Sequence, residues 1–395
     1  MPGPLQGIRV IELAGIGPGP FAAMVLADLG ADVIRVDRAS SVRRAAPDTV
    51  PTDTVPTDTV PTDTMGRGRR SIGVDLKTTA GIEVVLRLVS SAEALIEGFR
   101  PGVTERLGLG PEDCWTRNPK LVYGRMTGWG QDGPYASCAG HDINYAALSG
   151  TLSLIGRRGE PPLPPVNFLA DFGGGGMLLA LGILAGVLAV SRSGRGQVVD
   201  AAMVDGAALL STMIWGFAAT GDWGERGTNL LDTGAWFYQT YECADGRYIT
   251  IGSLEPQFYS EMLRLTGLGA GADGGGLVPD QHDRSTWPAM KERMAAAVRT
   301  KSRDEWCALL EHTDACFAPV LTMEEATQHP HNRARGTFVN VAGVVQPGPA
   351  PRFSRTPPDI PHPPPAPGAH TEAVLGDLGF SVGDVKAMLE AGAVR

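Results

Sequence analysis

Residues 4–38, PLQGIRVIELAGIGPGPFAAMVLADLGADVIRVDR, carry the clearest pattern of secondary structure in the chain. Their apolar pattern predicts a strand over 9–13, a Gly/Pro turn, a helix over 21–30 that ends at a glycine, and a second strand over 31–37. The same order returns with strands over 71–76, 93–99 and 121–126 and a helix over 81–92. Strands that alternate with helices in this way indicate right-handed crossovers. We therefore expect an α/β fold whose large domain is doubly wound around a mainly parallel sheet.

A change of composition near residue 230 indicates a second, smaller domain. Residues 236–252 alternate around Asp245 and Gly246, which predicts a β-hairpin. Helix starts of the Ser/Thr-x-x-Glu type follow at Ser302 and Thr322, which is typical of an α+β domain. The expected parts are a large domain over 1–200, a linker over 201–234, a small domain over 235–328, and a return linker with the C-terminal part of the large domain over 329–395.

Two segments have the composition of spacers. Residues 47–65 repeat the unit PTDTV, whose Pro, Thr and Asp cannot build a core, so we expect a solvated extended loop. Residues 346–375 are rich in proline, which predicts an extended strap.

Charge and cysteine content exclude several function classes. The chain has 34 Lys and Arg against 43 Asp and Glu, a net charge of −9 that repels nucleic acid and anionic membrane surfaces. Its five cysteines form no C-x-x-C pair, which argues against a disulfide framework or a zinc site and favours the reducing cytoplasm. The uncharged stretch over 173–191 is interpreted as a buried helix rather than a membrane span. From the net charge and from this helix, we expect neither a nucleic-acid nor a membrane partner.

Two features near the N-terminus bear on which ligand the protein binds: the turn at 15–20 and a group of basic residues. GIGPGP at 15–20 follows a strand and precedes a helix, but Pro20 occupies the place of the third glycine in a dinucleotide fingerprint, which argues against hydride chemistry. Arginine side chains can hold a phosphorylated ligand, and a solvated basic face is the alternative. The basic residues in question are Arg35, Arg38, Arg43, Arg44, Arg67, Arg69, Arg70, Lys77, Arg100 and Arg106.

His141 follows a glycine-rich loop over 127–140 and stands directly before Asp142. A histidine at the start of a helix can move protons, while the unpaired backbone N–H groups of that start hold an oxyanion. The alternative is a histidine that only caps a turn.

Two carboxylates are further candidates. Asp171 precedes four glycines and an apolar helix, so its side chain would stand at the mouth of an apolar pocket, where burial raises its pKa toward that of a useful base. An aspartate that caps a helix is the alternative. Glu255 stands at a helix start before Pro256, where a carboxylate that only complements the helix dipole is equally expected.

Nine ordered blocks share a pattern with one family. The chain resembles the family III CoA-transferase fold group and, within it, the alpha-methylacyl-CoA racemases. The blocks are 4–38, GRGRRSIGVDLKTTAG (66–81), IEGFRPGVTERLGLG (96–110), RMTGWGQDGPYA (125–136), GHDINY (140–145), ADFGGGGMLLALGILA (170–185), GRGQVVDAAMVDG (194–206), DGRYITIGSLEPQFY (245–259) and HTEAVLGDLGFS (370–381).

The resemblance implies an isomerase that inverts the alpha carbon of 2-methyl-branched acyl-CoA thioesters through an enolate. His141 and Asp171 would act on opposite faces, and the helix start at Asp142 would supply donors to the enolate oxygen. Glu255 would reach His141 of the partner subunit in an interlocked homodimer of large and small domains joined by long linkers. No metal or cofactor is implied, since CoA is part of the substrate. The implied CoA contacts are Arg38, Val74, Lys77, Phe99 and Arg106.

Two other functions stay open at this point. A CoA transferase would use Asp171 to attack the thioester and form a mixed anhydride. A CoA-binding or scaffold protein would have no turnover. The acyl group is equally open between branched fatty acids, steroid side chains and aryl-propionates, and the PTDTV repeat departs from the family pattern beside the early arginines.

Overall fold

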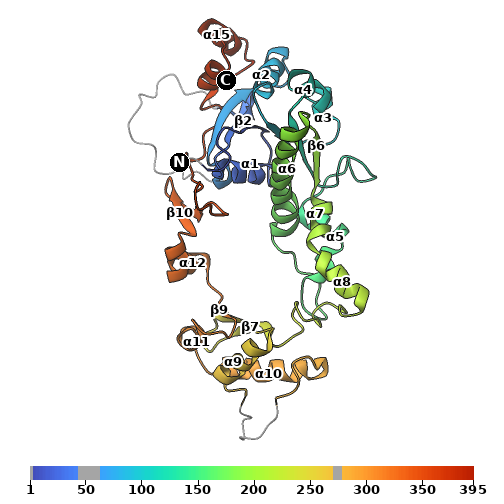
Figure 1. Ribbon diagram of the computed structural model, residues 1–395, viewed down its shortest axis with the longest axis vertical. Coiled ribbons are helices and arrows are strands. Elements are labelled where there is room, and N and C mark those ends of the chain that lie inside the picture. The colour runs from blue at the N-terminus through green and yellow to red at the C-terminus, as the bar shows by residue number, and fades with distance from the viewer. Residues whose placement is uncertain (1–2, 43–62, 270–277) are drawn as a thin grey trace. The chain divides into compact units, whose positions relative to one another are not determined.

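The computed structural model describes residues 3–42, 63–269 and 278–395 (Figure 1). These residues form two compact units. The first is built from Met1–Ser149, Val166–Leu210 and Ala334–Arg395, and the second from Gly150–Pro165 and Ser211–Arg333. The domain boundaries expected above stay predictions. Most of the PTDTV repeat, residues 47–62, lies outside the described residues.

A six-stranded parallel sheet forms the centre of the first unit. Its order is β3 (Arg69–Val74), β2 (Asp32–Arg38), β1 (Arg9–Leu13), β4 (Ala94–Glu97), β5 (Val122–Thr127) and β6 (Val198–Ala202). Strand β1 pairs in parallel with β2 on one side and with β4 on the other, so the order reverses there. The prediction of an α/β fold with a parallel sheet is confirmed. A reversal of strand order opens a crevice at the carboxyl ends of the strands.

Helices surround this sheet. Helix α2 buries Val84, Val85 and Leu88 against it, and its first turn is capped by Thr78, whose hydroxyl accepts a 3.0 Å hydrogen bond from the Gly81 N–H. The helices of the unit are α1 (Pro18–Asp28), α2 (Thr79–Val89), α3 (Val103–Arg106), α4 (Pro111–Arg117), α5 (Asp142–Leu148), α6 (Leu178–Ser193), α7 (Met203–Leu210), α14 (Thr371–Asp377) and α15 (Val382–Glu390).

The long apolar helix has one buried and one exposed face. A π-helix, Phe168–Met177, continues into α6 (Figure 1). A Cβ atom added at Gly124 of β5 would lie 2.8 Å from the Ile183 side chain of α6, so the helix packs closely on this strand. The whole helix, Phe168–Ser193, is long and apolar enough to cross a membrane, and 39% of its most apolar window is buried. The interpretation as a buried helix is therefore only partly right, because a sheet can cover only one stripe of a helix. Four large apolar side chains on it are exposed: Phe168, Met177, Leu181 and Leu188.

The proline-rich segment returns to the edge of the sheet. Between β11 (Val344–Pro347) and α14 it forms no helix or strand, and its end covers the outer edge of β3. The Ser71 N–H donates to Nδ1 of His370 at 3.1 Å, and the Gly73 N–H donates to Thr371 Oγ1 at 3.0 Å. These side chains satisfy edge groups that would otherwise be open to another strand. Strand β11 pairs with β10 (Phe338–Val341).

The second unit is a small α+β body. Strands β7 (Tyr238–Glu242) and β8 (Tyr248–Gly252) form the expected hairpin, and β9 (Phe317–Pro319) pairs antiparallel with β8. Both expected capping boxes are present, at Ser302 and Thr322. Trp236 and Trp306 are fully buried in its core. Its helices are α8 (Thr212–Thr220), α9 (Pro256–Thr266), α10 (Trp287–Val298), α11 (Arg303–Leu310) and α12 (Met323–Gln328), and α13 (Pro330–Arg335) follows at the boundary of the unit.

Candidate active site

A pocket of about 740 Å³ lies in the first unit, beyond the carboxyl ends of β1, β4 and β5. The turn at 15–20, the segment 98–101, and the loop at 126–141 form three of its walls. The pocket therefore occupies the place where a sheet with reversed strand order binds its ligand. His141 and Asp171, which stand far apart in the chain, both line it.

Local hydrogen bonds position His141. The residue precedes the first turn of α5 in an extended conformation, and its backbone N–H donates to Asn144 Oδ1 at 3.0 Å. Its imidazole is exposed on the pocket wall. A glycine-rich loop can present a helix start in this way because the backbone before it turns freely.

The Asp142 side chain connects His141 to Asp171. It is 5% exposed, and its Oδ1 accepts hydrogen bonds from the backbone N–H groups of Ala170 at 2.7 Å and of Asp171 at 2.8 Å. Sequence reasoning assigned donors to the start of α5 but missed this acceptor role. The carboxylate satisfies donors in the first turn of the π-helix, as a capping residue does, although it comes from another helix.

Asp171 lies within the π-helix, and its carboxylate faces the Gly/Pro turn at residues 15–20. A Cβ atom added at Gly17 would lie 3.6 Å from Asp171 Oδ2. Burial raises the pKa of Asp171, the charge of Asp142 raises it further, and the Asn167 side chain and His141 oppose this rise. The direction agrees with the expectation for a base at an apolar pocket. Asn167, not Asp171, precedes the helix, so the alternative of a capping aspartate is wrong.

Tyr145 is a site residue that sequence reasoning missed. Its hydroxyl donates to the carbonyl oxygen of Gly140, directly before His141. Its ring packs edge-on against the Trp129 ring, with 4.7 Å between the ring centroids. A Cβ atom added at Gly128 would lie 2.1 Å from the Tyr145 ring, so only glycine fits there. The spacing of four residues between His141, directly before α5, and Tyr145, within it, was the available signal.

The four glycines after Asp171 serve helix packing. A Cβ atom added at Gly174 would lie 2.6 Å from the backbone nitrogen of Ala207 in α7, and one added at Gly176 would lie 2.7 Å from the Phe21 ring in α1. The close approach that the glycines allow is therefore to neighbouring helices of the same unit. This packing fixes the π-helix, and with it Asp171, against α1 and α7.

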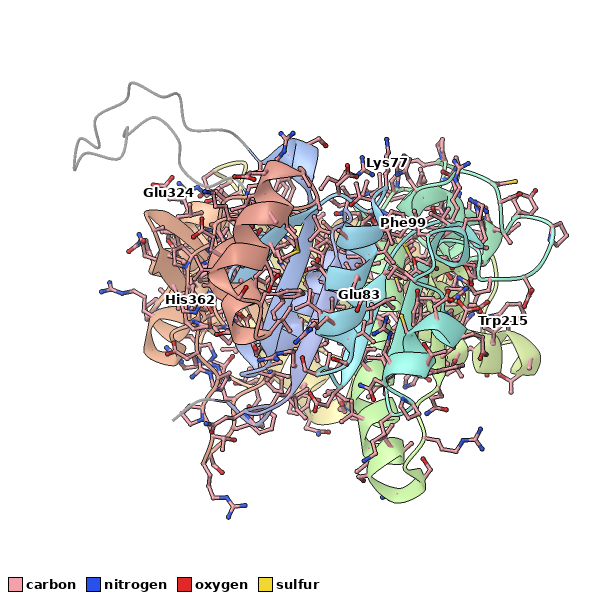
Figure 2. All side chains as sticks on the ribbon, turned by 90° about the horizontal axis from the view of Figure 1, so that it is seen from above. Lys77, Glu83, Phe99, Trp215, Glu324 and His362 are labelled. Carbon is pink, nitrogen blue, oxygen red and sulfur yellow. The ribbon has the colours of Figure 1, made fainter. Side chains whose placement is uncertain are left out.

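The expected CoA contacts divide into two groups. Arg38 and Phe99 line the pocket, together with Arg100. Val74, Lys77 and Arg106 do not line it: Val74 is a buried strand residue, and the other two are exposed. Figure 2 shows Lys77 near the outline of the molecule and Phe99 further inside it.

Four of the early arginines are engaged in ion pairs with buried or half-buried carboxylates. Arg43 and Arg44 lie outside the described residues. The four pairs brace the sheet and its first turn rather than offer free guanidinium groups. The pairs are Arg35 with Asp37 at 2.8 Å, Arg67 with Asp28 at 2.6 Å, Arg69 with Glu12 at 2.7 Å, and Arg70 with Asp32 at 2.8 Å.

Glu255 belongs to the second unit. It is exposed and stands directly before α9, with Pro256 at the first helical position, as expected. Its pairing with His141 stays a prediction. Across residues 3–42, 63–269 and 278–395, no group of three His, Cys, Asp or Glu side chains is arranged to hold a metal ion.

Known proteins resemble the chain over almost its whole length. It is 47% identical over 381 residues to alpha-methylacyl-CoA racemase from Mus musculus, covering 95% of this chain and 94% of that protein, and 46% identical to the Homo sapiens protein of the same name over the same shares. A CAIB/BAIF family protein from Brucella suis has a similar structure, with a TM-score of 0.80 and 28% identity over 96% of this chain and 100% of its own. Residues 5–371 match CoA-transferase family III. The chain belongs to this family.

Proposed function

We propose that this protein is an alpha-methylacyl-CoA racemase, an isomerase that interconverts the R and S forms of 2-methyl-branched acyl-CoA thioesters. The observation that carries the proposal is the presence of His141 and Asp171 on one pocket, in a chain that is 47% identical to a racemase of this name. The reaction needs one proton acceptor and one proton donor at the same carbon, and these two side chains can supply them.

The proposed reaction is a transfer of protons only. One of the two residues, unprotonated, takes the alpha proton, and the electron pair of the C–H bond moves into the thioester to form an enolate. The other residue, protonated, returns a proton to the opposite face of the alpha carbon. For the reverse direction the two exchange roles, so their protonation states must be opposite at rest. The raised pKa of Asp171 brings it closer to the range in which a carboxyl group can both accept and donate a proton.

The enolate oxygen requires hydrogen-bond donors that are fixed before the reaction. We assign this role to backbone N–H groups at the start of α5, as the sequence predicted. The Asp142 carboxylate is bonded to the π-helix, so its contribution is to hold that helix start and Asp171 in a constant relation.

Binding of the CoA part is assigned to the positive side chains at the rim of the pocket. Arg38 and Arg100 can meet phosphate groups, and the Phe99 segment can meet the adenine or pantetheine part. Val74, Lys77 and Arg106 remain proposed contacts outside the pocket lining. CoA is part of the substrate, and the chemistry calls for neither a metal nor a redox cofactor.

We further propose that the protein works as an interlocked homodimer in the cytoplasm. Exposed apolar side chains on the helix Phe168–Ser193, among them Leu181 and Leu188, support a partner surface of the same chain rather than a membrane. Glu255 of the partner subunit would then orient His141. All five cysteines are free, which fits a reducing compartment.

The alternative within the family is a CoA transferase that uses Asp171 as a nucleophile. One experiment separates the two. The protein is incubated with a 2-methylacyl-CoA of one configuration in heavy water, and in parallel with a second free carboxylic acid. We expect deuterium at the alpha carbon together with loss of stereochemical purity. Asp171→Asn and His141→Ala should each slow the loss of stereochemical purity by about 10²- to 10⁴-fold. Transfer of CoA to the added acid without deuterium uptake would replace the racemase by the transferase, and inactivity in both assays would favour a binding protein.

The pH dependence tests the carboxylate pair. Activity in the direction in which Asp171 acts as the base should fall as the pH drops through the raised pKa of Asp171. Asp142→Asn removes a neighbouring negative charge but keeps an acceptor oxygen, so it should lower the pKa of Asp171 and move the acid limb of kcat/KM to lower pH. Asp132→Asn, at an exposed position of the loop before His141, is the matched control and should leave the limb in place. An acid limb that is the same in all three proteins would remove Asp171 from the base role.

A mixing experiment tests the shared site. A His141→Ala chain and a Glu255→Gln chain are co-expressed with different tags, and the doubly tagged heterodimer is isolated. If Glu255 completes the site of the partner, one of the two sites in this heterodimer is intact, so about half of the wild-type activity should return. If each site were built within one chain, both sites of the heterodimer would carry a defect. The heterodimer would then be no more active than the homodimers of the single variants.

A further inference from the structure

We propose that Arg125 is a positioning residue, which ties the wall of the pocket that carries Phe99 to the loop that carries His141. The inference builds on the proposed function, because it assigns the first wall to CoA binding and the second to proton transfer. Arg125 does not line the pocket. It acts through its neighbours, at the point where the sheet ends beneath both walls.

On one side, Arg125 holds the segment after β4. The residue is 7% exposed, its guanidinium bonds to the Glu105 carboxylate of α3, and its Nε lies 3.8 Å from Glu97 Oε1. Glu97 in turn accepts a 2.6 Å hydrogen bond from the backbone N–H of Phe99. Arg125 is therefore connected to both ends of the segment from Phe99 to α3, whose residues Phe99 and Arg100 form the wall.

On the other side, Arg125 holds the loop before His141. Its second terminal nitrogen donates to the side-chain oxygen of Gln131, and the Gln131 backbone N–H donates to Asp200 Oδ2 of β6 at 3.1 Å. Gln131 lies between Trp129 and His141, which both line the pocket. The loop is thus attached to β5 through a side chain and to β6 through its backbone.

Only an arginine fits this arrangement. The planar guanidinium sends its two terminal nitrogens to two acceptors in different directions and keeps its charge when buried, whereas a lysine offers a single centre. Burial raises the pKa of Glu97 to about 7 against the opposing effect of Arg125, so the positive charge also favours the ionised form of the carboxylate that accepts from Phe99.

The two attachments can be cut one at a time. Glu105→Ala releases the wall at α3, and Gln131→Leu releases the loop. We expect Glu105→Ala to raise KM for a 2-methylacyl-CoA by about tenfold and to leave kcat within about twofold. We expect Gln131→Leu to lower kcat by about tenfold and to leave KM within about twofold, because a small misplacement of a reacting group has a large effect on the chemical step. Arg125→Lys should show both changes. Glu105→Gln and Gln131→Glu keep an acceptor oxygen and should recover most of each loss.

Two readouts do not depend on turnover. The dissociation constant of free CoA should rise in Glu105→Ala and stay unchanged in Gln131→Leu. Backbone hydrogen exchange over residues 128–140 should accelerate in Gln131→Leu and not in Glu105→Ala. Arg117→Lys, which alters an exposed ion pair with Glu83 on the surface, is the control and should change none of these values.

The outcomes separate the two proposals. If the wild-type protein does not epimerise its substrate but the CoA and exchange readouts divide as stated, the racemase assignment fails and the role of Arg125 stands. If both variants change KM and kcat in the same proportion, or change only the melting temperature, or leave loop exchange and CoA binding unaltered, Arg125 is a structural residue and the proposal is overturned.

Discussion

The site depends on two hydrogen bonds, those that Asp142 Oδ1 accepts from the backbone of Ala170 and Asp171. They join the start of α5 to the first turn of the π-helix, two segments that the chain brings together only through the tertiary fold. His141 stands beside the acceptor and Asp171 carries one of the donors. The backbone segments that carry the two proposed proton carriers are therefore held together by the Asp142 side chain, which accepts from two backbone N–H groups.

The remaining architecture supports this junction. The parallel sheet reverses its order at β1 and leaves an opening at the carboxyl ends of its strands, and the glycine run lets the π-helix pack against α1 and α7 at that opening. Ion pairs such as Arg69 with Glu12 stiffen the base of the first turn, which faces the Asp171 carboxylate. The negative charge of Asp142 then has a second effect, because it adds to burial in raising the pKa of its neighbour. One side chain thus sets both geometry and proton affinity.

Sequence patterns predicted the elements better than the contacts. Alternating strands and helices near the N-terminus predicted the parallel sheet, and Asp245 with Gly246 predicted the hairpin of the second unit, because these signals are local. The side-chain role of Asp142 and the Tyr145 contact to Gly140 were missed, since the first joins residues 28 and 29 positions apart and the second needs the space left by Gly128. The basic residues were read as one group, but local spacing could not show that Arg35, Arg67, Arg69 and Arg70 face buried or half-buried carboxylates.

His141 and Asp171 are proposed to act on opposite faces of one alpha carbon, and a crystal structure of the protein with a bound 2-methylacyl-CoA would show whether they can. We expect the alpha carbon to lie between the His141 imidazole and the Asp171 carboxylate, about 3–3.5 Å from each and with the two groups on opposite sides of the carbon. A complex in which Asp171 faces the thioester carbonyl carbon, with His141 remote from the alpha carbon, would contradict it.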